Sequence, residues 1–140
     1  MQVEWVVLAD AAEVVDNKLY LLGGGWTRLT VHSGFPAAQH CAVATAVLVD
    51  WEETQQSHEF SLEVYDPEEQ LISAIEAEFE VGRPHGVPAG KPQRWQFAGD
   101  FDLVLDGPGT HTVMVVIGGE ELCRQDFEVV KGVRAADLPG

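Results

Sequence analysis

Short segments in which apolar and polar residues alternate recur along this chain, and most of them end in turn-forming residues. Segment 58–65 shows the pattern most clearly, because Phe60, Leu62 and Val64 occupy every second position between polar neighbours. A period of two places all the apolar side chains on one face of a β-strand. The sequence therefore predicts a chain built mainly from strands, each with one covered face.

Nine segments fit a strand: 2–9, 18–22, 26–32, 40–49, 58–65, 70–81, 94–105, 110–117 and 121–130. Residues 10–17 favour either a short helical turn or a loop. Segment 70–81 also suits a helix, but its glutamates alternate with Ala and Phe, which favours a strand. Within 94–105, Ala98-Gly99-Asp100 indicates a bulge or a break. Gly118-Gly119 predicts a hairpin between the last two strands.

Regularly spaced strands without a long helix indicate an all-β fold. The predicted architecture is an antiparallel β-sandwich of the immunoglobulin-like, Greek-key type with about nine strands, and a β-barrel is the alternative. Segment 40–49 carries no charged side chain in its CAVATAVLV run, so we expect a strand covered on both faces. Residues 1–130 are predicted to form one domain, and residues 131–140 a C-terminal tail that frays.

The net charge of the chain excludes some classes of binding partner. Among 140 residues, 23 are acidic and 8 are Lys or Arg, which gives a net charge of −15. Such a surface repels phosphate backbones and anionic lipids, so neither nucleic acid nor a membrane is an expected partner. The first ten residues lack the basic region of a signal peptide. Cys41 and Cys123 lie in apolar segments and are predicted to be buried free thiols, which favours a cytoplasmic location.

The sequence gives no positive indication of catalysis, a cofactor or a metal site. Adjacent acids such as Glu52/Glu53 and Glu68/Glu69 lie in predicted turns, and no loop has a calcium-binding spacing. The five histidines never occur at an i, i+2 or i, i+4 spacing. Neither cysteine lies in an activating turn, and no serine lies in a GxSxG motif. We therefore expect a protein that is not an enzyme, while a metal site assembled by the fold stays open.

Gly23-Gly24-Gly25 and Trp26 stand out in KLYLLGGGW. The spacing of a phosphate-binding loop with its following lysine is absent, and Trp26 occupies the next position. Glycine reaches backbone angles that are closed to other residues. We predict a structural role, in which the glycines reverse the chain so that Trp26 packs one sheet onto the other.

Two loops carry the candidate binding residues. DWEETQQSH (50–58) presents Trp51, Glu52 and His58, while GRPHGVPAG (82–90) presents Arg83 and His85 on a rigid proline-rich frame. In so acidic a chain Arg83 is expected to pair with Glu52 or Glu53, which would pin the loop. The alternative is a shallow recognition patch formed by these five residues.

Three stretches together resemble a known family: LADAAEVVDNKLYLLGGGW, VDWEETQQSHEFSLEVYD and FEVGRPHGVPAG. They resemble a group of small bacterial proteins, an uncharacterised domain family (DUF6941-like), and the resemblance extends from Met1 to about Val130. It implies a bacterial, all-β, stand-alone domain, and it brings no established activity to any residue.

The sequence is consistent with three functions. The leading prediction is a non-enzymatic binding or accessory module of the bacterial cytoplasm, with a protein partner of unknown identity. The second is a small-ligand or carbohydrate-binding sandwich that uses Trp26, Trp51 or Trp95 as a stacking platform. The third is a hydrolase with a loop site built from Glu52, His58 and His85. A homodimer is also considered, because sandwich edges pair readily.

Overall fold

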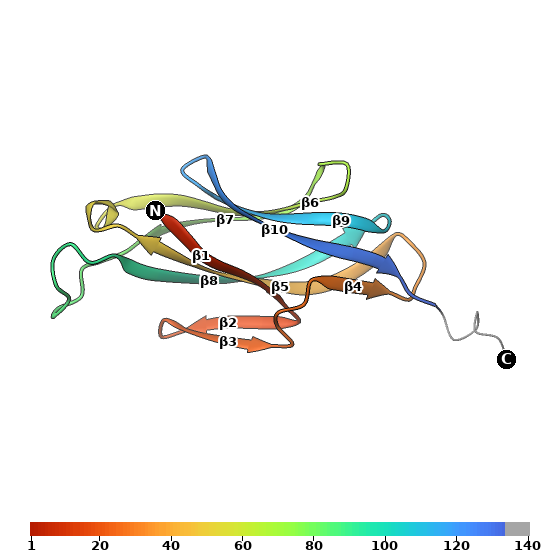
Figure 1. Ribbon diagram of the computed structural model, residues 1–140, viewed down its shortest axis with the longest axis horizontal. Coiled ribbons are helices and arrows are strands. Elements are labelled where there is room, and N and C mark those ends of the chain that lie inside the picture. Colours follow the sequence, from red (N-terminus) through yellow and green to blue (C-terminus); the bar gives the residue numbers. More distant parts are fainter. Residues whose placement is uncertain (134–140) are drawn as a thin grey trace.

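The structure is a computed structural model that describes residues 1–133 (Figure 1). It contains ten strands and one short 3-10 helix: β1 (Gln2–Ala9), β2 (Ala11–Val15), β3 (Lys18–Leu22), β4 (Arg28–Val31), β5 (Ala37–Val49), η1 (Trp51–Glu53), β6 (Ser57–Tyr65), β7 (Leu71–Glu80), β8 (Gln93–Leu105), β9 (Gly109–Ile117) and β10 (Glu120–Lys131). The predicted all-β class is confirmed. The number of strands differs from the prediction, with ten in place of about nine.

The strands form three sheets. One has the order β1-β5-β8, the second has the order β4-β10-β9-β6-β7, and β2 pairs with β3 alone. The core lies between the two larger sheets and includes Val43 and Val47 of β5, Leu62 of β6 and Val115 of β9, all at 0% exposure. One pair departs from the predicted antiparallel arrangement, since β4 runs parallel to β10.

The β2–β3 hairpin explains why β5 is apolar on both faces. Ala42, Ala44 and Ala46 point away from the core, yet each is 0% exposed. The hairpin contacts β5 and β8 on that side, and Figure 1 shows it on the side of β5 away from β6 and β7. Short alanine side chains let the hairpin approach closely. The two-sided covering predicted for segment 40–49 is confirmed from Cys41 to Val49, while His40 is exposed.

The prediction for residues 10–17 is wrong, because they contain strand β2 in place of a helical turn or loop. The two residues between β2 and β3, Asp16 and Asn17, have φ values of 51° and 58°. Two consecutive positive φ angles in a two-residue loop are those of the tight turn whose twist matches a hairpin. The local preference of Ala and Glu for helix is outweighed here by pairing with β3.

The bulge expected at Ala98–Asp100 is also wrong. Strand β8 pairs with β5 without a register shift, from Gln93 opposite Val49 to Leu105 opposite Ala37. Gly99 serves a different purpose, because a Cβ atom there would lie 2.6 Å from Cδ1 of Ile75 on β7. The missing side chain lets Ile75 pack against the strand across the core.

Gly23 and Gly25 lead the chain from the hairpin into the second large sheet. Both have positive φ, +60° and +91°, and the N–H of Gly25 donates to the carbonyl of Leu8 at 2.8 Å. A Cβ on Gly23 would lie 2.2 Å from Oδ2 of Asp10, so the close approach also requires glycine.

Trp26 then packs against the core of the sheet that the chain has entered. Its ring meets Phe127 of β10 edge to face, with the centroids 6.0 Å apart. Its buried indole N–H has no hydrogen-bond partner among the described residues. Trp26 therefore contributes apolar packing to this part of the fold.

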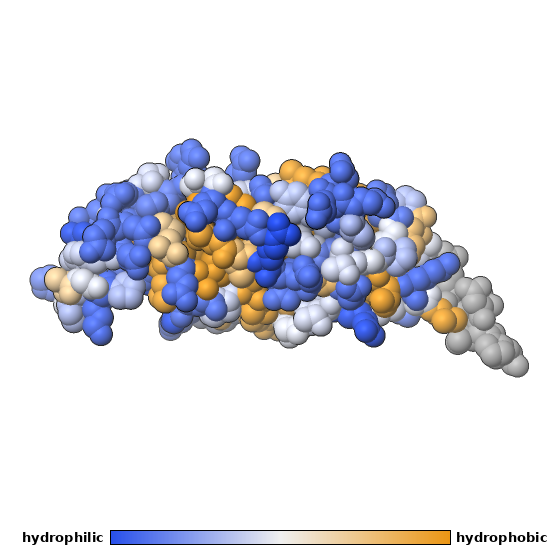
Figure 2. Space-filling model, turned by 45° about the horizontal axis from the view of Figure 1, so that its top comes forward, coloured by the Kyte–Doolittle hydropathy of each residue, from blue (hydrophilic) through white to orange (hydrophobic). Residues whose placement is uncertain are grey.

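The last predicted element is partly outside the described residues. Strand β10 continues to Lys131, the first residue of the predicted tail 131–140, and residues 134–140 lie outside the described chain. The hairpin predicted at Gly118-Gly119 is confirmed. The visible surface is mostly hydrophilic, with a broad hydrophobic area left of its centre and smaller ones at the top edge and on the right (Figure 2).

Candidate functional site

The candidate site forms where η1 follows β5 and meets the loop after β7. The N–H of Asp50 donates to Oε1 of Glu53 at 3.2 Å, which closes the first turn of η1. Thr54 ends the helix, and its hydroxyl donates to the carbonyl of Trp51 at 2.6 Å. Thr54 is almost fully buried at 2% exposure, so it anchors the turn to the body of the domain.

Arg83 lies across this turn and stacks on Trp51. Its Nε donates to Oγ1 of Thr54 at 2.7 Å, and an Nη atom donates to the carbonyl of Trp51 at 2.9 Å. The guanidinium carbon lies 4.0 Å from the centre of the Trp51 ring, which is cation–π geometry. The predicted ion pair with Glu52 or Glu53 is wrong. The Trp51 carbonyl and the Thr54 hydroxyl accept hydrogen bonds from the guanidinium N–H groups, and the Trp51 ring covers the guanidinium face. Together these groups take the place of a carboxylate.

His58 belongs to the same site and is held from two sides. Its Nε2 lies 2.7 Å from the carbonyl oxygen of Glu53, and its ring packs against Phe79 of β7 with centroids 5.3 Å apart. The N–H of Gln55 also donates to the carbonyl of Val81 at 2.7 Å. The helix, β6 and the end of β7 are thus tied together around Trp51 and Arg83.

The remaining two predicted residues do not join this cluster. Glu52 is exposed on η1, and His85 is exposed in the loop after β7. Within residues 1–133, no hydrogen bond or ring contact links either side chain to Trp51, His58 or Arg83. The hydrolase arrangement of Glu52, His58 and His85 is therefore not assembled, since the partner of His58 is a backbone carbonyl.

The tryptophans predicted as stacking platforms are engaged within the protein. Trp95 stacks on Phe79 with centroids 3.9 Å apart and an interplanar angle of 8°. Trp26 packs against Phe127, and one face of Trp51 carries Arg83. A ring in such contacts offers less free surface to a sugar.

Sequence reasoning missed a contact of the chain terminus with the site. The amino group of Met1 lies 3.2 Å from Oδ2 of Asp50 and 2.9 Å from Oε1 of Glu53. The hydrogen bond with Glu53 raises the pKa of this amino group, against a lowering by burial. No local pattern signals this contact, because the partners are about fifty positions apart.

A second group that the sequence did not indicate lies on the outer face of β5 and β8. Nδ1 of His40 is 3.0 Å from Oδ1 of Asp102, and its Nε2 is 3.5 Å from Oδ1 of Asp100. The hydrogen bond to Asp102 raises the pKa of His40, opposed by desolvation. Strand register explains the contact, since His40 is directly opposite Asp102.

The cysteines are free, as the sequence predicts. Cys41 is 1% exposed, and burial, followed by the charges of Asp102 and Asp100, raises the pKa of its thiol to about 11. Cys123 is only partly buried. Cys41 is thus protonated near neutral pH and has little nucleophilic character.

Two further features of residues 1–133 bear on the class of site. Across that range, no group of three or more His, Cys, Asp or Glu side chains is placed to hold a metal ion. The same residues contain no helix with the length and apolar character of a membrane span.

The fold and the site define an all-β domain with two facing sheets and a loop cluster at one end. Over residues 4–130 the chain matches the model of a family described as "Family of unknown function (DUF6941)". The chain belongs to this family, as the resemblance implied. No curated protein matches it.

Two solved structures are distantly similar to this chain. An alkylpurine DNA glycosylase AlkC from Pseudomonas fluorescens, bound to DNA containing an abasic site analog, is 12% identical with a TM-score of 0.43. The match covers 89% of this chain and 30% of that one. A β-glucosidase from Listeria innocua in complex with isofagomine is 14% identical with a TM-score of 0.43, over 77% of this chain and 15% of that one. The chain thus spans less than a third of either neighbour, and neither activity carries over to it.

Proposed function

We propose that this chain is a non-enzymatic binding or accessory module of a bacterial cytoplasmic protein, and that it contacts a protein partner through the loops around Trp51 and Arg83. The observation that carries the proposal is the stacking of Arg83 on Trp51, fixed by its bonds to Thr54 and to the carbonyl of Trp51. Arginine and tryptophan are enriched among residues that dominate binding energy. A pair held in place before binding loses little side-chain entropy when a partner arrives.

For the fold, we infer the immunoglobulin-like, Greek-key type of sandwich. The sheet β1-β5-β8 faces β10-β9-β6-β7, and β4 extends the second sheet beside β10. In residues 1–133 no pairing joins the edge strands of the two large sheets, which favours a sandwich over the closed barrel. Loops at the end of such a sandwich are common positions for binding residues.

Affinity purification from the native host tests the function. The wild-type chain and a Trp51→Ala/Arg83→Ala variant are used as baits, with Arg28→Ala as a matched control that removes a distant arginine. We expect one partner with the wild type and the control, and its loss from the double variant once melting shows that this variant is folded. Recovery of the chain alone, or equal capture by all three baits, contradicts the proposal.

A further inference from the structure

Among the described residues, no strand pairs with the outer edge of β7, which is a free edge of the five-stranded sheet. Strand β7 pairs with β6 from Glu80 opposite Ser57 to Leu71 opposite Tyr65, and it is the last strand in the sheet order. Its ten residues contain no proline, and the one register shift lies at its beginning, beside Tyr65. Unpaired backbone groups along such an edge are a template for another strand.

The inner side of β7 is apolar and incompletely covered. Ile75 and Ala77 are half-buried residues that pack against the core, and Phe79 is buried. Across the core, the facing residues Trp95 and Phe97 of β8 are also only half-buried. An added strand beside β7 would remove more of this apolar surface from water, which favours its binding.

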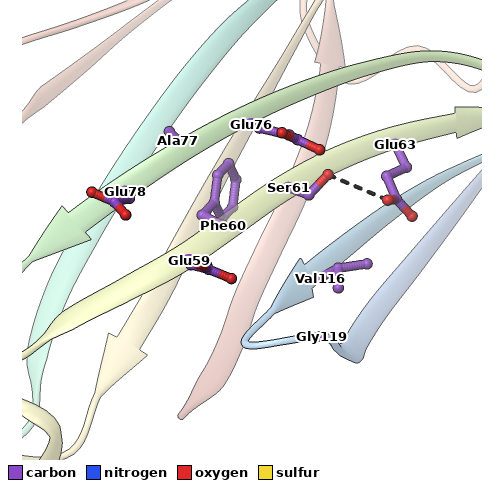
Figure 3. Close-up of a pocket in the computed structure, with 9 residues that line it drawn as sticks. All are labelled: Glu59, Phe60, Ser61, Glu63, Glu76, Ala77, Glu78, Val116 and Gly119. Carbon is purple, nitrogen blue, oxygen red and sulfur yellow. Dashed lines mark hydrogen bonds between the residues drawn. The ribbon is translucent and has the colours of Figure 1, made fainter.

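The outer side of β7 is acidic and hollowed. Glu76, Glu78 and Glu80 alternate with the apolar residues and are exposed. Glu59 of β6 lies directly opposite Glu78, so two like charges form a cross-strand pair. A hollow of about 530 Å³ lies over β6 and β7 on this side, and Glu59, Glu76 and Glu78 help to line it. Figure 3 shows these three side chains along the two strands.

Within residues 1–133, the structure places no ion-pair partner beside the carboxylates of Glu59, Glu76 and Glu78. Like charges placed directly opposite each other destabilise a sheet. A cationic side chain arriving from outside would remove that penalty, so the edge and its charge favour the same kind of ligand.

We propose that the free edge of β7 docks an extended segment of a partner protein in which Lys or Arg alternates with apolar residues. The segment adds as a further strand of the sheet. Its backbone bonds to β7, its cations lie beside Glu76 and Glu78, and its apolar side chains continue the inner face at Ile75 and Ala77. The alternation in β7 thus specifies the alternation of the ligand.

A second copy of the chain fits this edge poorly. A two-fold axis that pairs β7 with β7 of another copy keeps outer faces on the same side. The three carboxylates of one copy would then meet the same three of the other, and like charges oppose that contact. The same glutamates that repel a second copy attract a basic strand.

Calorimetry and hydrogen exchange with synthetic peptides test the proposal. The probe is a ten-residue peptide of alternating Lys and Val, and the matched peptide alternates Glu and Val. We expect the Lys peptide to bind saturably and the Glu peptide not to bind, and we expect added salt to weaken the binding. Amide exchange should become slower in β7 and stay unchanged in β4. Absence of binding at millimolar peptide, or protection confined to another strand, overturns the proposal.

Charge variants then show whether the acidic face selects the ligand. Glu76→Gln/Glu78→Gln is compared with Glu13→Gln/Asp106→Asn, which changes the net charge equally at distant positions. We expect about fivefold weaker binding of the Lys peptide by the first variant and no change by the second. Equal affinities contradict the proposal, as does a wild-type dimer with β7 protected in the absence of peptide. The loop site around Trp51 contacts β7 only at its end, through Phe79, so its Trp51→Ala/Arg83→Ala variant should still bind the peptide normally.

Discussion

Gly23 lies where the chain leaves the β2–β3 hairpin and turns toward Trp26. Its φ of +60° disfavours any residue with a Cβ atom, and that atom would also meet the Asp10 carboxylate. The neighbouring Gly24 lacks a positive φ, and a Cβ there would lie 3.3 Å from Cδ1 of Leu21. Two adjacent glycines therefore differ in how strictly the fold requires them.

Gly23→Ala should lower the free energy of unfolding by about 1–3 kcal/mol, because it combines backbone strain with a close contact. Gly24→Ala should change it by less than about 1 kcal/mol, since the angle is compatible with alanine. Urea denaturation of both variants measures the difference. Equal losses would show that the segment is not held in this conformation.

Arg83→Lys should destabilise the loop cluster almost as much as Arg83→Ala, by about 1–2 kcal/mol. Lysine keeps the charge, but it lacks the planar fork that donates to Thr54 and Trp51 while covering the Trp51 ring. Thermal melting checks this, and Arg28→Ala is the control for the loss of a surface arginine. Wild-type stability in the lysine variant would mean that charge alone matters at this position.

At the scale of elements, the acidic face of β6 and β7 has a stability cost of its own. Glu78→Gln removes one member of the like-charged pair with Glu59 without changing the shape of the side chain. We expect a rise in Tm of about 1–4 °C at low salt. Calorimetry at two salt concentrations measures it, and Glu13→Gln is a control on another strand. A fall in Tm would indicate that Glu78 makes a stabilising contact.

The alternation of the sequence predicts most strands correctly, because a strand with one covered face has a period of two. It fails where pairing with a distant segment outweighs local preference. Strand β2 contains Ala and Glu, which favour helix, and its pairing with β3 decides the outcome. The turn residues Asp16 and Asn17 carried the signal that could have found this hairpin.

The loop site was partly predictable for a similar reason. Scarcity of basic residues singles out Arg83, and the loops flanking two strong strands single out Trp51 and His58. Composition suggests a carboxylate as the partner of Arg83, but the partners are a hydroxyl, a carbonyl and a ring. Which of these converge depends on how the loop after β7 returns to η1, and a single sequence does not encode that as a local pattern.

For the molecule as a whole, charge governs how stability depends on pH. The hydrogen bond to Asp102 raises the pKa of His40 above its ordinary 6.5. The contribution of His40 to the free energy of unfolding is therefore complete below its ordinary pKa and is lost as pH rises through the raised pKa. Arg94 lowers the pKa of Glu4, and Arg124 lowers that of Glu121. Those two contributions are present above the ordinary pKa of 4.5 and are lost as pH falls through the lowered values.

The net charge of −15 has the same effect on stability above pH 6 as His40 has. Protons that bind as pH falls reduce the self-repulsion of the folded chain, which raises its stability. Stability should consequently rise as pH decreases from about 8 to about 6, and decline again below about pH 4.5. Urea midpoints measured across this range, with His40→Gln as the matched variant, separate the two causes. The variant should show a shallower slope between pH 6 and 8, and added salt should flatten the part that comes from net charge. A profile that rises toward pH 8 would contradict both causes, because each predicts the opposite sign.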